Sequence, residues 1–163
     1  MASAYSYRRA KVGGILTGIG LGGFVDGIVL HQILQWHNML STVLPPTTME
    51  AMKTNMFADG LFHAAVWLAT FVGMLLLWSA ARQMRVIPAI PWLLGLMLIG
   101  WGLFNVVEGL IDHQILGIHH VRGWEPNTAW DVGFLLSGPV LGLVGWLLIR
   151  STKADQSTIA GTP

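Results

Sequence analysis

Four apolar stretches decide what this chain can fold into. They lie at about 12–37, 57–81, 91–118 and 129–150, and each is long enough to cross the hydrocarbon core of a bilayer, which takes about 20 residues of helix. Only 10% of the 163 residues are charged, against about 25% in soluble domains. The pattern predicts an all-α polytopic membrane protein, one transmembrane domain over residues 1–163, with a disordered tail at 151–163.

The connections between the apolar stretches contain helix-breaking residues, among them Pro45, Pro88 and Pro126. Pro139 lies inside the fourth stretch and predicts a kink there. Seven of the nine basic residues fall at the two ends of the chain and in the second connection: Arg8, Arg9, Lys11, Arg82, Arg85, Arg150 and Lys153. Because basic residues favour the cytoplasmic side of a membrane, we expect both termini in the cytoplasm.

Two copies of one motif lie 82 residues apart. Residues 26–38 read DGIVLHQILQWHN, and residues 108–120 read EGLIDHQILGIHH. Residues 55–59 (NMFAD) and 127–131 (NTAWD) form a weaker echo. The pattern predicts a duplicated two-helix repeat, in which spans 1–2 and 3–4 are related by a pseudo-two-fold axis along the membrane normal.

A glycine heptad follows the same offset, with glycines at 13, 20 and 27 in the first span and at 95, 102 and 109 in the third. Small residues at this spacing allow two helix backbones to approach closely in lipid. We therefore expect the first and third spans to touch along this face.

The ionisable residues are concentrated towards one end of the predicted bundle. His31, His63 and His113 lie at similar depth, below His37, His119 and His120 at the outer surface. Five of the eight acids lie inside the spans: Asp26, Asp59, Glu108, Asp112 and Asp131. A charged side chain costs at least about 2.5–3.5 kcal/mol at the centre of a bilayer, so these acids must face the interior and have partners.

A helical wheel at 100° per residue separates these side chains. Asp26 shares a face with His37, whereas His31 lies about 120° away on the glycine face. The same separation recurs between Glu108 and His113. Either the two faces serve different sites, or the helices deform near the motif.

Three interpretations of these residues remain open. The first is a transition-metal site, with mixed imidazole and carboxylate donors that suit iron, copper or zinc. His31, His63 and His113 would be the core ligands. Asp112, Glu108 or Asp26 would be carboxylate ligands or their hydrogen-bonding partners, with Asp59 nearby. His37, His119 and His120 would form a mouth site or a second metal position.

The second interpretation is a haem held axially by His31 and His113, which close contact between the glycine faces disfavours. The third is a proton relay or a structural network without metal. A separate stripe, Met49, Met52 and Met56, lies on one face of a helix that Thr48 would cap. Thioethers select copper(I), although such a stripe also serves apolar packing.

Composition excludes several other classes. The chain has no cysteine, so disulfides and thiolate metal sites are absent. A net charge of +1 favours no polyanionic partner such as nucleic acid. The partners that remain are the lipid bilayer, a second copy of the chain, and a periplasmic redox or metal donor.

The segments GGFVDGIVLHQILQWHNML and NVVEGLIDHQILGIHHVR, together with four spans, resemble a family of bacterial membrane proteins classed as a domain of unknown function. The resemblance extends from about residue 11 to residue 150 and implies a protein of the bacterial inner membrane. We expect a metal-dependent membrane oxidoreductase; the alternative is a non-enzymatic protein that binds or transfers metal, copper in particular.

Overall fold

The structure is a computed structural model, and it describes residues 4–83, 89–123 and 129–160. Its helices are α1 (Ala4–Val25), α2 (Met49–Ala81), α3 (Ile90–Glu108) and α4 (Ala129–Ala160). α1 and α3 each continue into a π-helical segment, η1 (Asp26–Ile33) and η2 (Gly109–Ile115). The described residues contain four helices that are long and apolar enough to cross a membrane. The predicted all-α fold with four spans is confirmed.

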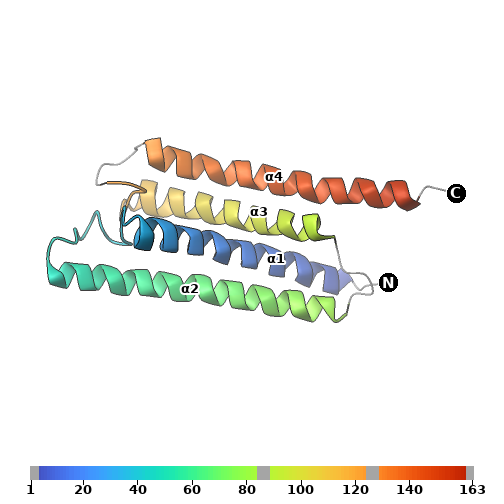
Figure 1. The fold of residues 1–163 in the computed structure, drawn as a ribbon, viewed down its shortest axis with the longest axis horizontal. Helices are drawn as coiled ribbons and strands as arrows, with labels where there is room; N and C mark the ends of the chain where they lie inside the picture. The colour runs from blue at the N-terminus through green and yellow to red at the C-terminus, as the bar shows by residue number, and fades with distance from the viewer. Residues whose placement is uncertain (1–3, 84–88, 124–128, 161–163) are drawn as a thin grey trace.

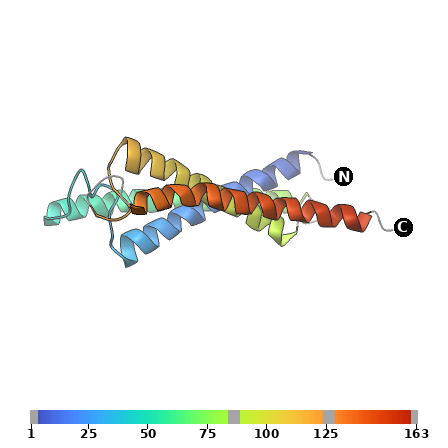
Figure 2. The same ribbon diagram turned by 90° about the horizontal axis from the view of Figure 1, so that it is seen from above.

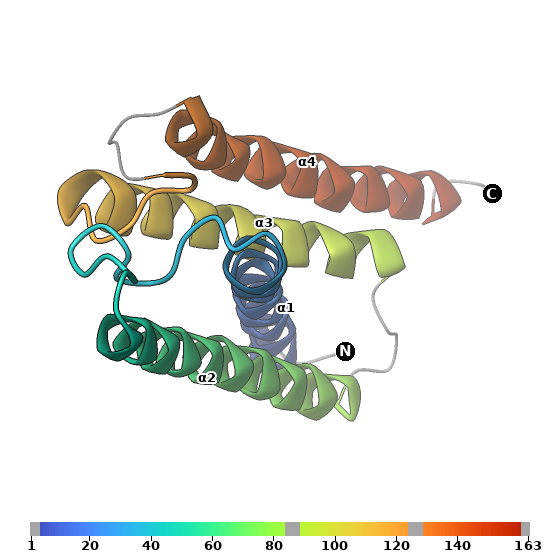
Figure 3. The ribbon, with the colours of Figure 1, turned by 60° about the vertical axis from the view of Figure 1, so that its left-hand side comes forward.

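α1 and α3 form the centre of the bundle, and α2 and α4 flank them on opposite sides (Figure 1). Seen from above, α1 and α3 cross like the arms of an X (Figure 2). The view in Figure 3 looks almost along α1 while α3 runs across the picture, so the crossing is steep. Half of the apolar window of α1 is buried, against 11% in α2 and in α4. The two outer helices therefore present most of their apolar surface to lipid.

The contact between α1 and α3 is made by glycines other than the predicted ones. A Cβ on Gly18 would overlap the backbone of Met97, and a Cβ on Gly100 would overlap the backbone of Ile15. Both pairs carry the offset of 82 residues, since 18 corresponds to 100 and 15 to 97. The crossing point therefore requires the smallest residue on each helix.

The predicted heptad packs elsewhere. Gly20 faces Val66 and Thr70 of α2, and Gly102 faces Gly138 of α4. The expectation that this stripe joins the first and third spans was wrong. A helix in the middle of the bundle needs small residues on two faces, and the heptad serves the face that meets the outer helix.

Both central helices deform where the repeated motif begins. Asp26–Ile33 and Gly109–Ile115 form π-helical segments, and each ends shortly before a residue with left-handed backbone, Gln35 at φ 51° and Gly117 at φ 57°. A π-helical segment changes the angular spacing of successive side chains. Of the two alternatives left open by the helical wheel, deformation of the helices is the correct one.

Several boundaries differ from the sequence expectation. The first helical span ends at Ile33 rather than near 37, and the second begins at Met49 rather than near 57. The Thr48 hydroxyl accepts a hydrogen bond from the Ala51 amide, as expected of a helix N-cap. α4 continues through Pro139.

Residues 151–160 continue α4 in the structure, where the sequence predicted a disordered tail. The hydroxyls of Ser151 and Thr152 bond back to carbonyls of the preceding turn, which is compatible with helix. The predictions that concern Arg85, Pro88, Pro126, Asn127 and the tail residues 161–163 lie outside the described residues.

Candidate metal centre

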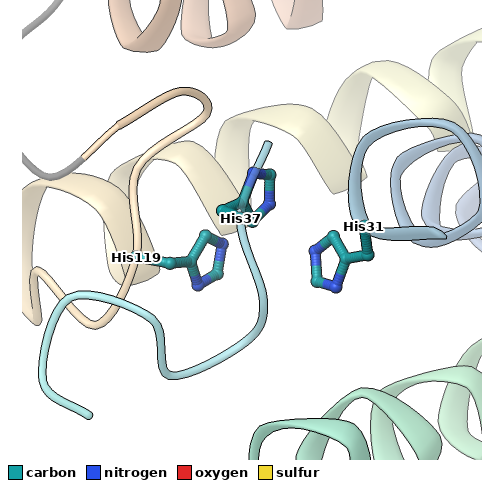
Figure 4. A group of neighbouring side chains, drawn as sticks. All are labelled: His31, His37 and His119. Atoms are coloured by element: carbon teal, nitrogen blue, oxygen red, sulfur yellow. The ribbon is translucent and has the colours of Figure 1, made fainter. Parts of the chain in front are cut away.

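The histidines gather at the end of the bundle opposite Ala4 and Ala160, which we call the histidine end. The connections after Ile33 and Ile115 both turn back there towards the central helices (Figure 1). In Figure 4 His37 and His119 come from these two connections and His31 from the end of the first span, and the three rings face one another. The rings of His37 and His119 are stacked, with centroids 4.7 Å apart and planes at 5°.

Hydrogen bonds exchanged between the two connections fix these two rings. His37 Nδ1 lies 2.9 Å from the carbonyl oxygen of Val121, and His119 Nδ1 lies 3.0 Å from that of Met39. A carbonyl oxygen can only accept, so Nδ1 must carry the proton in both rings. In the neutral rings Nε2 therefore keeps its lone pair, which is the arrangement common to metal-binding histidines.

Burial favours these neutral rings. The pKa of His37 is lowered to about 4 and that of His119 to about 2. The main cause is loss of solvent, which disfavours the charged imidazolium, and the neighbouring histidines lower both values further. At neutral pH both rings are uncharged and can donate electron pairs from Nε2.

His31 lies between two carboxylates. Its Nδ1 is 3.1 Å from Asp59 Oδ1, and its Nε2 is 3.2 Å from Asp26 Oδ2. Asp59 also accepts hydrogen bonds from the Asn38 side chain and from the Met39 amide. Asp59 thus joins the His31 ring to the connection that carries His37.

The second half of the chain repeats this pattern with different side chains. Asp131 lies 3.7 Å from His113 Nδ1 and 2.9 Å from His120 Nδ1, and it accepts a hydrogen bond from the Val121 amide. Asp131 therefore holds the second connection as Asp59 holds the first. His120 takes the place of Asn38.

Two groups of side chains are close enough to hold a metal ion. In the first, His31, His37 and His119 each offer a ligand atom within 4.8 Å of the others, and in the second the same holds for Glu108, His113 and His119. All five residues are buried. His119 belongs to both groups, and because its Nδ1 is bonded to Met39, only Nε2 is available to either.

Polar atoms at the centre of these groups lack hydrogen-bond partners among the described residues. They include Nε2 of His37 and of His113. The Glu108 carboxyl group lies 3.5 Å from His119 Nε2 and beside the carboxyl group of Asp26. A buried polar atom without a partner costs about 1–3 kcal/mol. A cation bound between these atoms would satisfy them together.

Five of the ten predicted residues form the two groups, and the other five lie outside them. Among these, Asp26 contacts His31. His63 Nδ1 bonds to the Asp59 carbonyl oxygen, one turn earlier in α2, and the ring lies beside Gly27. Asp112 is half-buried and lines a cavity with Glu108. Asp59 contacts Nδ1 of His31, and His120 contacts Asp131.

Asn38 and Asp131 were not among the predicted site residues, although both orient histidines or their connections. A signal for Asp131 was present in the sequence. The echo between residues 55–59 and 127–131 aligns it with Asp59, and Asp59 was predicted.

One comparison with known proteins supports a membrane protein. The family model described as "Predicted membrane protein (DUF2243)" matches residues 13–152. No curated protein and no solved structure matches the chain.

Proposed function

The chain belongs to this family of membrane proteins. We propose that it is a metal-dependent oxidoreductase of the bacterial inner membrane, with its site on the periplasmic side. The group of Glu108, His113 and His119 carries the proposal. Two imidazoles and one carboxylate on one side of an ion leave its remaining positions open, and this donor set is typical of non-haem iron enzymes that use dioxygen.

The surrounding contacts support a metal rather than a proton relay. Nδ1 of His119 is hydrogen-bonded to the Met39 carbonyl oxygen, so Nε2 is the nitrogen left for an ion. This partner orients the ring and raises its basicity as a ligand. Nδ1 of His113 lies 3.7 Å from Asp131, which is beyond hydrogen-bond distance. A relay would instead need hydrogen bonds that continue from one group to the next, whereas Nε2 of His113 has none among the described residues.

We expect one ion at a time, because the two groups share Nε2 of His119. The Glu108 group favours iron, and the group of three histidines favours copper or zinc. The carboxylate of Glu108 would also offset part of the charge that a buried cation brings into a medium of low dielectric constant.

The test is metal content together with redox behaviour. Protein purified in mild detergent after growth in iron-supplemented medium should contain about one equivalent of a transition metal, as one closed ligand set implies. Its absorption spectrum should change on anaerobic reduction, and addition of a reductant in air should consume dioxygen. Wild-type protein that is free of metal would contradict the proposal and favour a structural network.

A second candidate, a copper-transfer protein, is favoured by the methionines at the histidine end. Met49 is 72% exposed and Met56 is 62% exposed, with Met52 between them, and thioethers select copper(I). Rapid exchange of bound copper without turnover of dioxygen would support transfer. Replacement of Met49 and Met56 by Leu should then slow the exchange and leave the affinity of the buried site unchanged.

A further inference from the structure

A cavity of about 250 Å³ lies beside the candidate metal centre and is lined from α1, α2, α3 and η2. Five of its lining side chains are apolar, and the other two are Glu108 and Asp112. Leu103 and Val107 line it and are 47% and 46% exposed. Because this surface belongs to spans that cross the membrane, the cavity is accessible from the acyl chains of the lipids rather than from water.

The inner end of the cavity is polar. Glu108 is only 4% exposed. Its carboxyl group lies beside that of Asp26 and 3.5 Å from His119 Nε2. The same carboxylate belongs to the group with His113 and His119. The cavity therefore connects the lipid phase to a ligand of the candidate metal centre.

The other half of the chain does not offer the same chemistry. Position 112 corresponds to position 30 in the first half, which is Leu30. Leu30 lines a different cavity, of about 560 Å³, together with Trp36, Trp130 and Phe134, and its lining among the described residues includes no acid. The pair of carboxyl groups is thus particular to one side of the bundle.

We propose that the cavity beside Glu108 and Asp112 binds a lipid-soluble quinol. A ligand that enters from the bilayer must be lipid-soluble, and the two carboxyl groups at one end can accept hydrogen bonds from the hydroxyls of a quinol. Phe62 and Phe104, whose ring centroids are 6.0 Å apart, line the cavity and provide aromatic contacts for the quinol ring.

This inference deepens the proposed function, because a quinol is a membrane-soluble electron donor for an oxidoreductase. The binding itself does not require a metal. It can therefore be tested in the chelator-treated protein as well as in the metal-loaded protein.

The probe is a ubiquinol with a photoreactive diazirine in its alkyl tail, added under anaerobic conditions to the protein in phospholipid nanodiscs. After illumination, mass spectrometry should locate the label around residues 103–107. Excess decylubiquinol should abolish this labelling, and excess phospholipid should not. Label spread evenly over the lipid-facing surface, or equal displacement by phospholipid, would overturn the proposal.

Two variants with matched controls test the position. Val107→Trp fills the entrance and should reduce labelling at least about tenfold, the equivalent of about 1.4 kcal/mol. Val25→Trp alters the corresponding, similarly exposed residue of the first half and should leave labelling unchanged. Equal effects of the two substitutions would contradict the proposal.

Asp112→Asn removes a carboxylate that lines the cavity and belongs to neither candidate metal group. It should raise the decylubiquinol concentration needed for half-displacement by about tenfold, and Leu30→Asn should not change it. Saturable labelling of a protein that binds no metal would refute the metal centre alone. A metal-loaded protein without saturable labelling would refute the quinol site alone.

Discussion

At the scale of single residues, the position of one proton on each imidazole decides what the site can bind. His37 and His119 both place that proton on Nδ1, where a backbone carbonyl of the other connection accepts it. The lone pair of each ring is thereby directed into the centre of the cluster. Because the acceptors are main-chain atoms, substitution of the residues that carry them would not by itself remove these bonds.

His119→Ala and His63→Ala should have different effects on metal content. His119 is the only residue in both candidate groups, so its loss leaves neither group complete. We expect dialysed His119→Ala protein to retain less than about a tenth of the wild-type metal, since losing a ligand of a three-residue group costs well over about 1.4 kcal/mol. His63→Ala should retain nearly all of it.

Elemental analysis of the two variants, purified in parallel, checks this prediction. Loss of metal in His63→Ala with retention in His119→Ala would contradict this prediction. It would favour the ligand set predicted from the sequence, which included His63. Thermal unfolding of both variants is the control for a general loss of structure.

The sequence indicated which side chains gather at one end of the bundle, and was less informative about how they group. His37 and His119 were predicted for a separate mouth site, whereas they lie against His31 and His113. His31, His37, His113, His119, Asp26 and Glu108 were all predicted and do lie together in the structure. His63 was predicted by depth alone, and its nitrogen bonds to its own helix instead. The carbonyl partners of His37 and His119 could not be predicted, because a backbone acceptor has no residue type that marks it.

At the scale of secondary structure, the π-helical segments and the left-handed residues after them turn each connection back towards the site. Position 35 and position 117 are related by the offset of 82 residues and share the same backbone conformation. One is Gln and the other Gly. The first half therefore bears a backbone strain that the second half avoids, since left-handed backbone costs a residue other than Gly about 1–2 kcal/mol.

Gly117→Val should lower the midpoint of thermal unfolding, whereas Gln35→Gly should maintain or raise it. A Cβ at position 117 would meet no atom within 4 Å, so the cost arises from the backbone alone. If the free energy of unfolding falls by about 1–2 kcal/mol, the expected decrease in the midpoint is roughly 2–8 °C for a chain of this size. Differential scanning calorimetry in detergent measures it, and equal midpoints for wild type and Gly117→Val would contradict it.

Helix existence was predictable and helix deformation was not. Length and apolar composition were sufficient for four spans, because only helices and closed barrels satisfy their backbone groups in lipid. The helical wheel placed Asp26 and His31 on different faces, whereas their side chains are 3.2 Å apart in the structure. The π-helical segment accounts for this difference. A regular helix of 100° per residue could indicate that the helix must deform near the motif, but not that the deformation would be π-helical.

At the scale of the whole molecule, the described parts of both connections that carry the site lie at one end. The start of α1, the end of α2, the start of α3 and the end of α4 lie at the other (Figure 1). This arrangement agrees with the predicted placement of both termini on one side. Which side faces the cytoplasm rests on the basic residues alone.

The absence of cysteine from the chain makes the orientation easy to test. In intact spheroplasts, a membrane-impermeant maleimide should label Val43→Cys, an exposed position at the histidine end. It should not label Arg82→Cys, at the opposite end, until the membrane is permeabilised. The reverse pattern would place the candidate metal centre in the cytoplasm.

The exchange of hydrogen bonds between the connections has a consequence for how the site can vary. Each half of the chain completes the other, with His37 bound to Val121 and His119 bound to Met39. In a dimer of identical subunits, a substitution would change both subunits at once. Here both connections belong to one polypeptide, so Asn38 can differ from His120 and Leu30 from Asp112. One side of the site can therefore carry an acid where the other side carries an apolar residue, within a single polypeptide.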